Sequence, residues 1–101
     1  MLYFYPTAGH PDGVQDLPWF IKISDLIFPW TGHPGGTQGM PWYSQDGDRI
    51  RTEYGNPEWL TPGHEYFHVR DQLCYPSGSH PAFPCDDDWY RIVNPLSLLH
   101  A

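Results

Sequence analysis

The chain has few basic residues. Lysine and arginine together account for five of its 101 residues, against twelve aspartates and glutamates, which gives a net charge of −7. The five are scattered, as Lys22, Arg49, Arg51, Arg70 and Arg91. Binding to nucleic acid requires a basic stripe or patch, so the composition argues against that class of function. It also disfavours an acidic partner and favours a basic protein surface.

Long apolar runs are also absent. A transmembrane helix needs about 20 consecutive apolar residues, and the best candidate, residues 19–30, is interrupted by Lys22, Ser24 and Asp25. We therefore predict no transmembrane helix. The segment Met1–Pro6 is too short for a signal-peptide core and has no basic residues before it, and the sequence shows no arginine-rich presequence.

Proline and glycine, in contrast, are abundant. The twelve prolines and ten glycines disfavour long helices, while an aromatic content of 17% argues against a disordered linker. We predict one small chain, residues 1–101, that is mostly irregular or extended and loop-rich, with short strands or short helices. Such a chain is expected to bury its aromatic residues on partners and to lack a cooperative core of its own.

The densest group of aromatic and charged residues is PWYSQDGDRIRTEYGNPEW, residues 41–59. Asp46–Asp48 predicts a turn, because Asp bonds its own backbone and Gly tolerates positive φ. The alternation in Arg49–Thr52 predicts a short strand. Rigid aromatic rings and planar guanidinium groups suit a protein interface. The partner-binding residues predicted on this basis are Trp42, Tyr43, Arg49, Arg51, Tyr54 and Trp59. The alternative is that these aromatic residues fill the chain's own core.

The same stretch resembles a known family. The matching residues are Pro41, Trp42, Tyr43, Ser44, Asp46, Arg49, Arg51, Gly55, Pro57 and Trp59. They resemble the ASHI family of accessory subunits, which belongs to the beta subcomplex of mitochondrial NADH:ubiquinone oxidoreductase (respiratory complex I). That family has a transmembrane helix after the motif, and this sequence has none. The resemblance implies a non-catalytic subunit that braces its neighbours in the membrane arm, with no cofactor and no catalytic residue.

The resemblance also implies a location at the mitochondrial inner membrane. The missing presequence argues against cleavage-dependent import into the matrix, and the net charge of −7 opposes transfer into a negative compartment. We therefore expect a peripheral subunit on the intermembrane-space face, in contact with other subunits of the complex.

An internal echo runs through the sequence. Residues 9–20, GHPDGVQDLPWF, align with residues 32–43, GHPGGTQGMPWY, at an offset of 23 residues, and seven of the twelve positions are identical. Weaker echoes occur at Gly55–Pro57 and Ser79–Pro81. A period of this length indicates a repeat whose unit is a turn plus one or two strands. The composition, rich in proline and tryptophan, also makes chance echoes easier.

Two short motifs point to metals. His64–His68 reads H-E-x-x-H, which on a helix binds zinc. Pro62 and Gly63 directly precede it, and no third ligand has a recognised spacing, so we predict no metal site and keep His64, His68 and His80 only as candidates. Proline at a first helical position does favour a short helix over Pro62–Leu73. His33–Gly36 reads H-P-G-G, like the haem-ligand signature of cytochrome b5, but its twin at His10 favours a repeated turn.

Cys74 and Cys85 are the only cysteines. A disulfide between them, worth about 3 kcal/mol if unstrained, is the first interpretation. Two buried thiols, or a zinc site with His68 and His80, are the alternatives. Asp86–Asp88 is predicted to be a solvated turn, and Trp89–Val93 a last short strand or the start of a helix.

Two functions of other classes compete with the accessory subunit. The first is a small lectin-like module in which repeated Trp-Tyr platforms stack on sugar rings. The second is a zinc hydrolase that uses His64, Glu65 and His68. A lectin should fold alone, whereas a bracing subunit should be poorly ordered without its partners.

Overall fold

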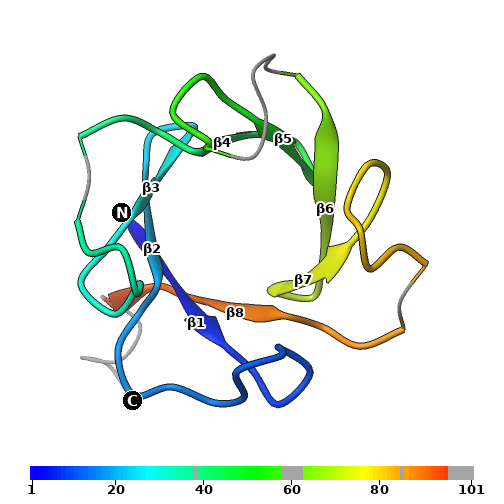
Figure 1. Ribbon diagram of the computed structural model, residues 1–101, viewed down its shortest axis with the longest axis horizontal. Helices are drawn as coiled ribbons and strands as arrows, with labels where there is room; N and C mark the ends of the chain where they lie inside the picture. The colour runs from blue at the N-terminus through cyan, green and yellow to red at the C-terminus, as the bar shows by residue number, and fades with distance from the viewer. Residues whose placement is uncertain (38, 58–62, 85, 96–101) are drawn as a thin grey trace.

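The computed structural model describes residues 1–37, 39–57, 63–84 and 86–95. These residues form eight strands that pair antiparallel in chain order, and the last strand pairs with the first to close a barrel (Figure 1). The strands are β1 (Leu2–Pro6), β2 (Phe20–Ile23), β3 (Leu26–Pro29), β4 (Tyr43–Asp46), β5 (Arg49–Thr52), β6 (Glu65–Arg70), β7 (Leu73–Pro76) and β8 (Tyr90–Val93).

The prediction of a mostly irregular, loop-rich chain is therefore wrong. Most of the strands have only four residues, too few to show a clear alternation, and the prolines and glycines lie mainly in the connections. The helix predicted over Pro62–Leu73 is also wrong, because Glu65–Arg70 is strand β6 and residues 71–72 form a turn. The strand predicted at Arg49–Thr52 is confirmed as β5. Within the described residues, no helix has the length and apolarity needed to cross a membrane.

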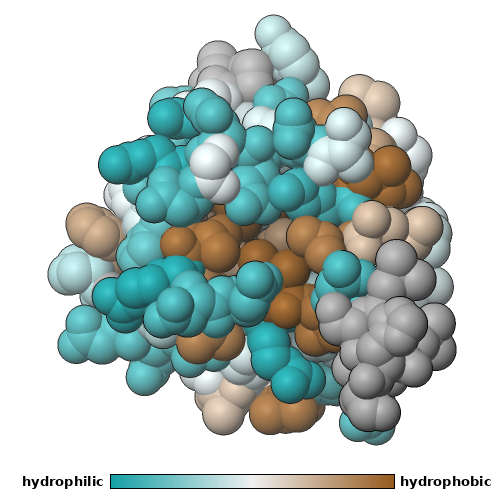
Figure 2. Space-filling model, turned by 180° about the vertical axis from the view of Figure 1, so that it is seen from behind, coloured by the Kyte–Doolittle hydropathy of each residue, from teal (hydrophilic) through white to brown (hydrophobic). Residues whose placement is uncertain are grey.

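The two ends of the barrel differ. At one end, tight turns at residues 24–25, 47–48 and 71–72 join β2 to β3, β4 to β5 and β6 to β7. We name this the hairpin end. The other end, here the loop end, carries four long connections: residues 7–19, 30–42, 53–64 and 77–89. Figure 2 shows the side turned away in Figure 1, where apolar side chains gather near the middle and hydrophilic ones surround them.

The four long connections share one construction. In each, a backbone N–H donates to the carbonyl three residues earlier, at 3.0 Å: His10 to Thr7, His33 to Trp30, Asn56 to Glu53 and His80 to Ser77. The residue one or two positions before each donor is a glycine, and these glycines recur every 23 residues as Gly9, Gly32, Gly55 and Gly78. A Cβ on any of them would lie within 2.1 to 2.7 Å of a backbone oxygen of the preceding connection or strand. Only glycine permits this close approach.

The barrel interior is filled by one residue from each strand. These side chains surround the same small internal space: Phe4, Phe20, Ile27, Tyr43, Ile50, Phe67, Cys74 and Tyr90. Four of them, Phe20, Tyr43, Phe67 and Tyr90, form a closed ring in which neighbouring ring centroids are 5.6 to 5.9 Å apart and the planes are steeply inclined. Edge-to-face packing of this kind stabilises an aromatic core beyond the area that it buries.

One irregularity marks the third unit. Ile50 of β5 pairs with Phe67 of β6, but Arg51 pairs with Glu65, so the register shifts by one residue. Tyr66 is the extra residue, and both Tyr66 and Phe67 are buried. This bulge lengthens the third unit by one residue and brings a second aromatic side chain to the loop end.

Candidate functional site: an aromatic bowl at the loop end

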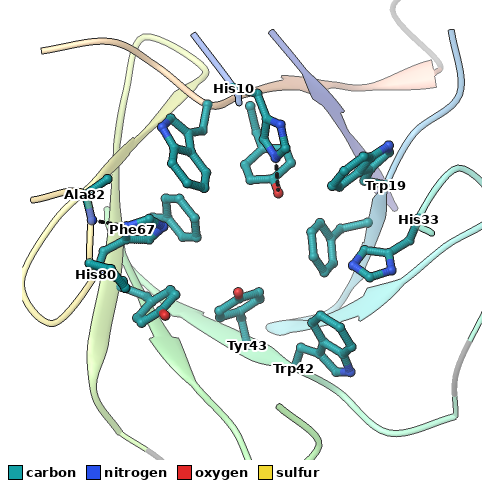
Figure 3. Close-up of a pocket in the computed structure, with 13 residues that line it drawn as sticks. His10, Trp19, His33, Trp42, Tyr43, Phe67, His80 and Ala82 are labelled. Carbon is teal, nitrogen blue, oxygen red and sulfur yellow. Dashed lines mark hydrogen bonds between the residues drawn. The ribbon is translucent and has the colours of Figure 1, made fainter. Parts of the chain in front are cut away.

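The loop end of the barrel holds an open cavity of about 470 Å³ (Figure 3). We name it the aromatic bowl. Its floor is the ring of Phe20, Tyr43, Phe67 and Tyr90 that also caps the core. Its wall consists of side chains from the long connections and the adjoining strand starts: His10, Trp19, His33, Trp42, Tyr66, His80, Pro81, Ala82 and Trp89.

In the wall, histidines alternate with larger aromatic residues. His10 lies between Trp19 and Trp89, with ring centroids 4.7 and 5.0 Å away. His33 lies between Trp19 and Trp42, at 5.3 and 4.7 Å. All four contacts are edge-to-face, with interplanar angles of 64 to 81°. The imidazoles thus act as spacers that keep neighbouring indoles from stacking on one another.

The other side of the wall follows the same order. His80 lies between Tyr66 and Trp89, with centroids 4.6 and 4.4 Å away. At the equivalent position of the third unit, Asn56 replaces histidine, and its Nδ2 donates to the Trp42 carbonyl at 3.4 Å. The wall is therefore a complete circle around the bowl.

The turn geometry fixes the histidine tautomers. In His10, His33 and His80, Nδ1 accepts the backbone N–H of the residue two positions further on, at 3.0 Å in each case. A nitrogen that accepts carries no proton, so the neutral ring bears its hydrogen on Nε2. Accordingly, His10 Nε2 lies 3.2 Å from the Tyr90 hydroxyl and donates to it.

The histidines of the bowl also favour the neutral state. Burial lowers the pKa of His10; Asp12 acts in the opposite direction, and His33 adds a smaller lowering effect. Burial alone lowers the pKa of His33. Protonation of either ring at Nδ1 would place an N–H against the backbone N–H that it now accepts. The bowl therefore stays uncharged at neutral pH.

This tautomer bears on the metal motifs. With Nδ1 occupied and a hydrogen on Nε2, neither nitrogen of His33 offers a lone pair to a haem iron while the turn is intact. The zinc candidates are separated by the fold: His64 and His68 lie four residues apart along extended chain, about 13 Å at strand spacing. His68 stacks on Tyr75 at 5.3 Å, and its neighbour Phe67 points into the core, so His68 lies on the barrel exterior, whereas His80 lines the bowl. No cluster of three or more potential metal ligands occurs among residues 1–37, 39–57, 63–84 and 86–95.

The predicted partner-binding residues do not form one surface. Trp42 lines the bowl, Tyr43 belongs to its floor, and Tyr54 is 73% exposed. Arg51 donates to the Gly63 carbonyl at 3.3 Å, and Trp59 lies outside the described residues.

Arg49, the remaining member of that set, is exposed and forms an ion pair with Glu65. Glu65 also accepts a hydrogen bond from Ser77. That bond is the main cause of the lowered pKa of Glu65, and Arg49 lowers it further. Glu65 thus has structural partners on β5 and on the connection after β7.

Cys74 is a free thiol in the barrel core, 1% exposed, where burial raises its pKa well above the usual range. Cys85 lies outside the described residues, so the predicted disulfide stays a prediction. The zinc alternative with His68 and His80 has little geometric basis, because Cys74 points into the core and His68 points outward.

Sequence reasoning identified Trp42 and His80 but missed most of the bowl. His10, Trp19, His33, Tyr66 and Trp89 were interpreted as turns and strand starts. The signal was the echo itself, because each unit places a histidine or asparagine and a large aromatic residue at matching positions. Closing four units into a circle brings these positions together around one cavity.

Comparisons with family models, with curated proteins and with solved structures found no match. The resemblance of residues 41–59 to the complex I family therefore has no support from them. In the structure, Pro41-Trp42-Tyr43 occupies the same place in its unit as Pro18-Trp19-Phe20 does in the preceding one. The repeat accounts for this part of the motif without a relationship to that family.

Proposed function

We propose that this protein is a binding module that takes one small molecule into the aromatic bowl. The observation that carries the proposal is the complete circle of Trp, Tyr and His side chains around a cavity of about 470 Å³. Cavities of roughly 300 to 1,000 Å³ lined by aromatic groups with a few polar ones are typical of small-molecule sites. Fixed spacers hold the indoles apart, so the cavity is formed before any ligand arrives, which lowers the entropic cost of binding.

The lining supports binding rather than catalysis. The described residues around the bowl include no carboxylate, no thiol and no serine or threonine hydroxyl. The histidines could act as bases only at nitrogens that are engaged in the turns or carry a proton. A nucleophile and a partner base, which covalent catalysis requires, are not brought together here.

The earlier functional predictions have different support. The lectin-like alternative shares the idea of aromatic platforms in one site, and sugars belong among the ligands to test. The bracing role in complex I, the mitochondrial location and the intermembrane-space side rest on the resemblance alone. The residues assigned to that role are divided among the bowl, the core and the barrel exterior, which is why we favour ligand binding.

A fragment screen by saturation-transfer NMR tests the proposal. The library should contain neutral sugars, carboxylates, aromatic compounds and methylated amines. Hits are retested on Trp89→Ala, which removes one indole from the wall, and on Tyr54→Ala, which removes an exposed aromatic ring away from the bowl. Near-UV circular dichroism checks that both variants fold.

We expect hits that Trp89→Ala abolishes or weakens by about tenfold or more, and that Tyr54→Ala leaves unchanged. Hits that are insensitive to Trp89→Ala and to Trp42→Ala, or no hit of any class, would overturn the proposal.

A further inference from the structure

The charge of this protein is unevenly distributed. The four connections at the loop end contain seven acidic residues and no lysine or arginine. The other five acidic residues and all five basic residues lie on strands or in hairpin turns, where they cancel. The loops that build the bowl therefore carry the whole net charge of −7. The acidic residues are Asp12, Asp16, Glu53, Glu58, Asp86, Asp87 and Asp88, of which Glu58 lies outside the described residues.

The interior of the bowl, by contrast, is neutral. Its described lining contains no ionised side chain, and its histidines are held in the uncharged form by their turns. The faces of indole and phenol rings carry a negative quadrupole that attracts cations. A neutral aromatic cavity inside an acidic rim attracts positive charge at both ranges: the rim acts at a distance, and the rings act on contact.

We propose that the ligand of the aromatic bowl is a small organic cation that carries a methylated ammonium group. This inference rests on the proposed function, and it specifies the class of ligand. An ammonium with N–H donors would need acceptors such as carboxylates inside the cavity, and the described lining has none. A quaternary ammonium has no donors, and its methyl groups present the positive charge directly to Trp19, Trp42, Tyr66 and Trp89.

The same features disfavour other ligands. An anion would meet the acidic rim without any basic side chain to receive it. A neutral sugar would gain stacking but nothing from the loop charge, and its many hydroxyls would meet few polar side chains in the bowl. A metal ion would find no imidazole lone pair while the turns are intact.

Isothermal titration calorimetry with two matched probes tests this inference. The first probe is choline. The second is its neutral isostere, in which a tert-butyl group replaces the trimethylammonium group, so that the shape is kept and the charge is removed. Methyl glucoside serves as the neutral sugar. We expect choline to bind at least about tenfold more tightly than the isostere, because cation–π attraction at several desolvated rings acts on choline alone.

Two triple variants separate the local charge of the loops from the total charge. Asp12→Asn, Asp16→Asn and Asp86→Asn together neutralise exposed acids of the loop end. Asp25→Asn, Asp46→Asn and Asp71→Asn together make the same change at the hairpin end, where these acids are also exposed. At about 20 mM salt, we expect the first variant to weaken choline binding about threefold and the second to change it much less, with the difference disappearing near 500 mM.

The outcomes separate the two proposals. Equal affinity for choline and its isostere, with both lost in Trp89→Ala, would overturn the cation inference and leave the bowl as a binding site. Tighter binding of methyl glucoside than of choline would do the same. Failure of these probes and of every compound in the fragment screen would overturn the proposed function itself.

Discussion

Gly55 provides a sharp test of how the loop end is built. Its N–H donates to the Pro41 carbonyl at 3.0 Å, directly before Trp42 of the bowl. A Cβ at residue 55 would lie 2.3 Å from the Pro41 oxygen and 2.7 Å from the Met40 Cβ. Because the obstacle is backbone, Gly55→Ala must separate the two connections rather than turn a side chain aside.

The expected cost has two parts. Overpacking against a fixed neighbour costs about 1 to 3 kcal/mol. The displaced Gly55–Pro41 hydrogen bond adds about 0.5 to 1.5 kcal/mol. The φ angle of Gly55 is outside the left-handed region, so no further backbone strain is added. The free energy of unfolding should fall by about 2 to 4 kcal/mol, and the melting temperature by roughly 10 to 20 °C.

Two other glycines are matched controls, measured by urea unfolding alongside Gly55→Ala. Gly13 has φ of +73° but no neighbour within 4 Å of an added Cβ, so Gly13→Ala should cost about 1 kcal/mol from strain alone. Gly39 has neither feature, and Gly39→Ala should be neutral or stabilise by up to about 1 kcal/mol. A Gly55→Ala variant within 0.5 kcal/mol of the parent, or a Gly13→Ala variant that costs more, would refute this description of the connections.

Three further predictions concern the folded barrel. The pKa values of His10 and His33 are lowered from 6.5, so the unfolded chain binds more protons; the free energy of unfolding should be constant above about pH 6.5 and decrease below it. Urea midpoints between pH 8 and 5 check this, and a midpoint that is flat or rises on acidification contradicts it. The Cys74 thiol should resist iodoacetamide in the native protein and react on unfolding, since it is 1% exposed with a raised pKa; mass spectrometry with and without prior reduction also tests the bridge to Cys85, and rapid native alkylation of Cys74 would show that the core is open. Finally, the closed barrel leads us to expect a sharp thermal transition with strong near-UV dichroism for the isolated chain, and a broad, gradual transition would instead favour the sequence-based expectation of a chain without a cooperative core.

The sequence predicted local features better than the closure of the barrel. The turn at Asp46–Asp48 and the strand at Arg49–Thr52 have clear local signals, since Asp-Gly favours positive φ and Arg-Ile-Arg alternates. The closed barrel has no such signal. Its strands are short, and neighbours such as Phe20 and Ile21 are both buried, which hides the period-two pattern.

The candidate site was hidden for a related reason. The first two units match closely, but the third has Asn56 in place of histidine, Tyr66 in place of tryptophan and one extra residue at the β6 bulge. These changes weaken the echo at the point where a fourfold circle would have become visible. The H-E-x-x-H motif then drew attention to His64 and His68, which lie apart on extended chain, while His10 and His33 were interpreted only as turn residues.

The most direct test of the central claim is a titration with choline followed by the indole N–H signals of ¹⁵N-labelled protein. Trp19, Trp42 and Trp89 line the bowl, and Trp30 does not. We predict that the first three signals shift together along one binding curve while the Trp30 signal stays in place. A shift of Trp30 alone, or no change in any of the three bowl signals at millimolar choline, would contradict the account.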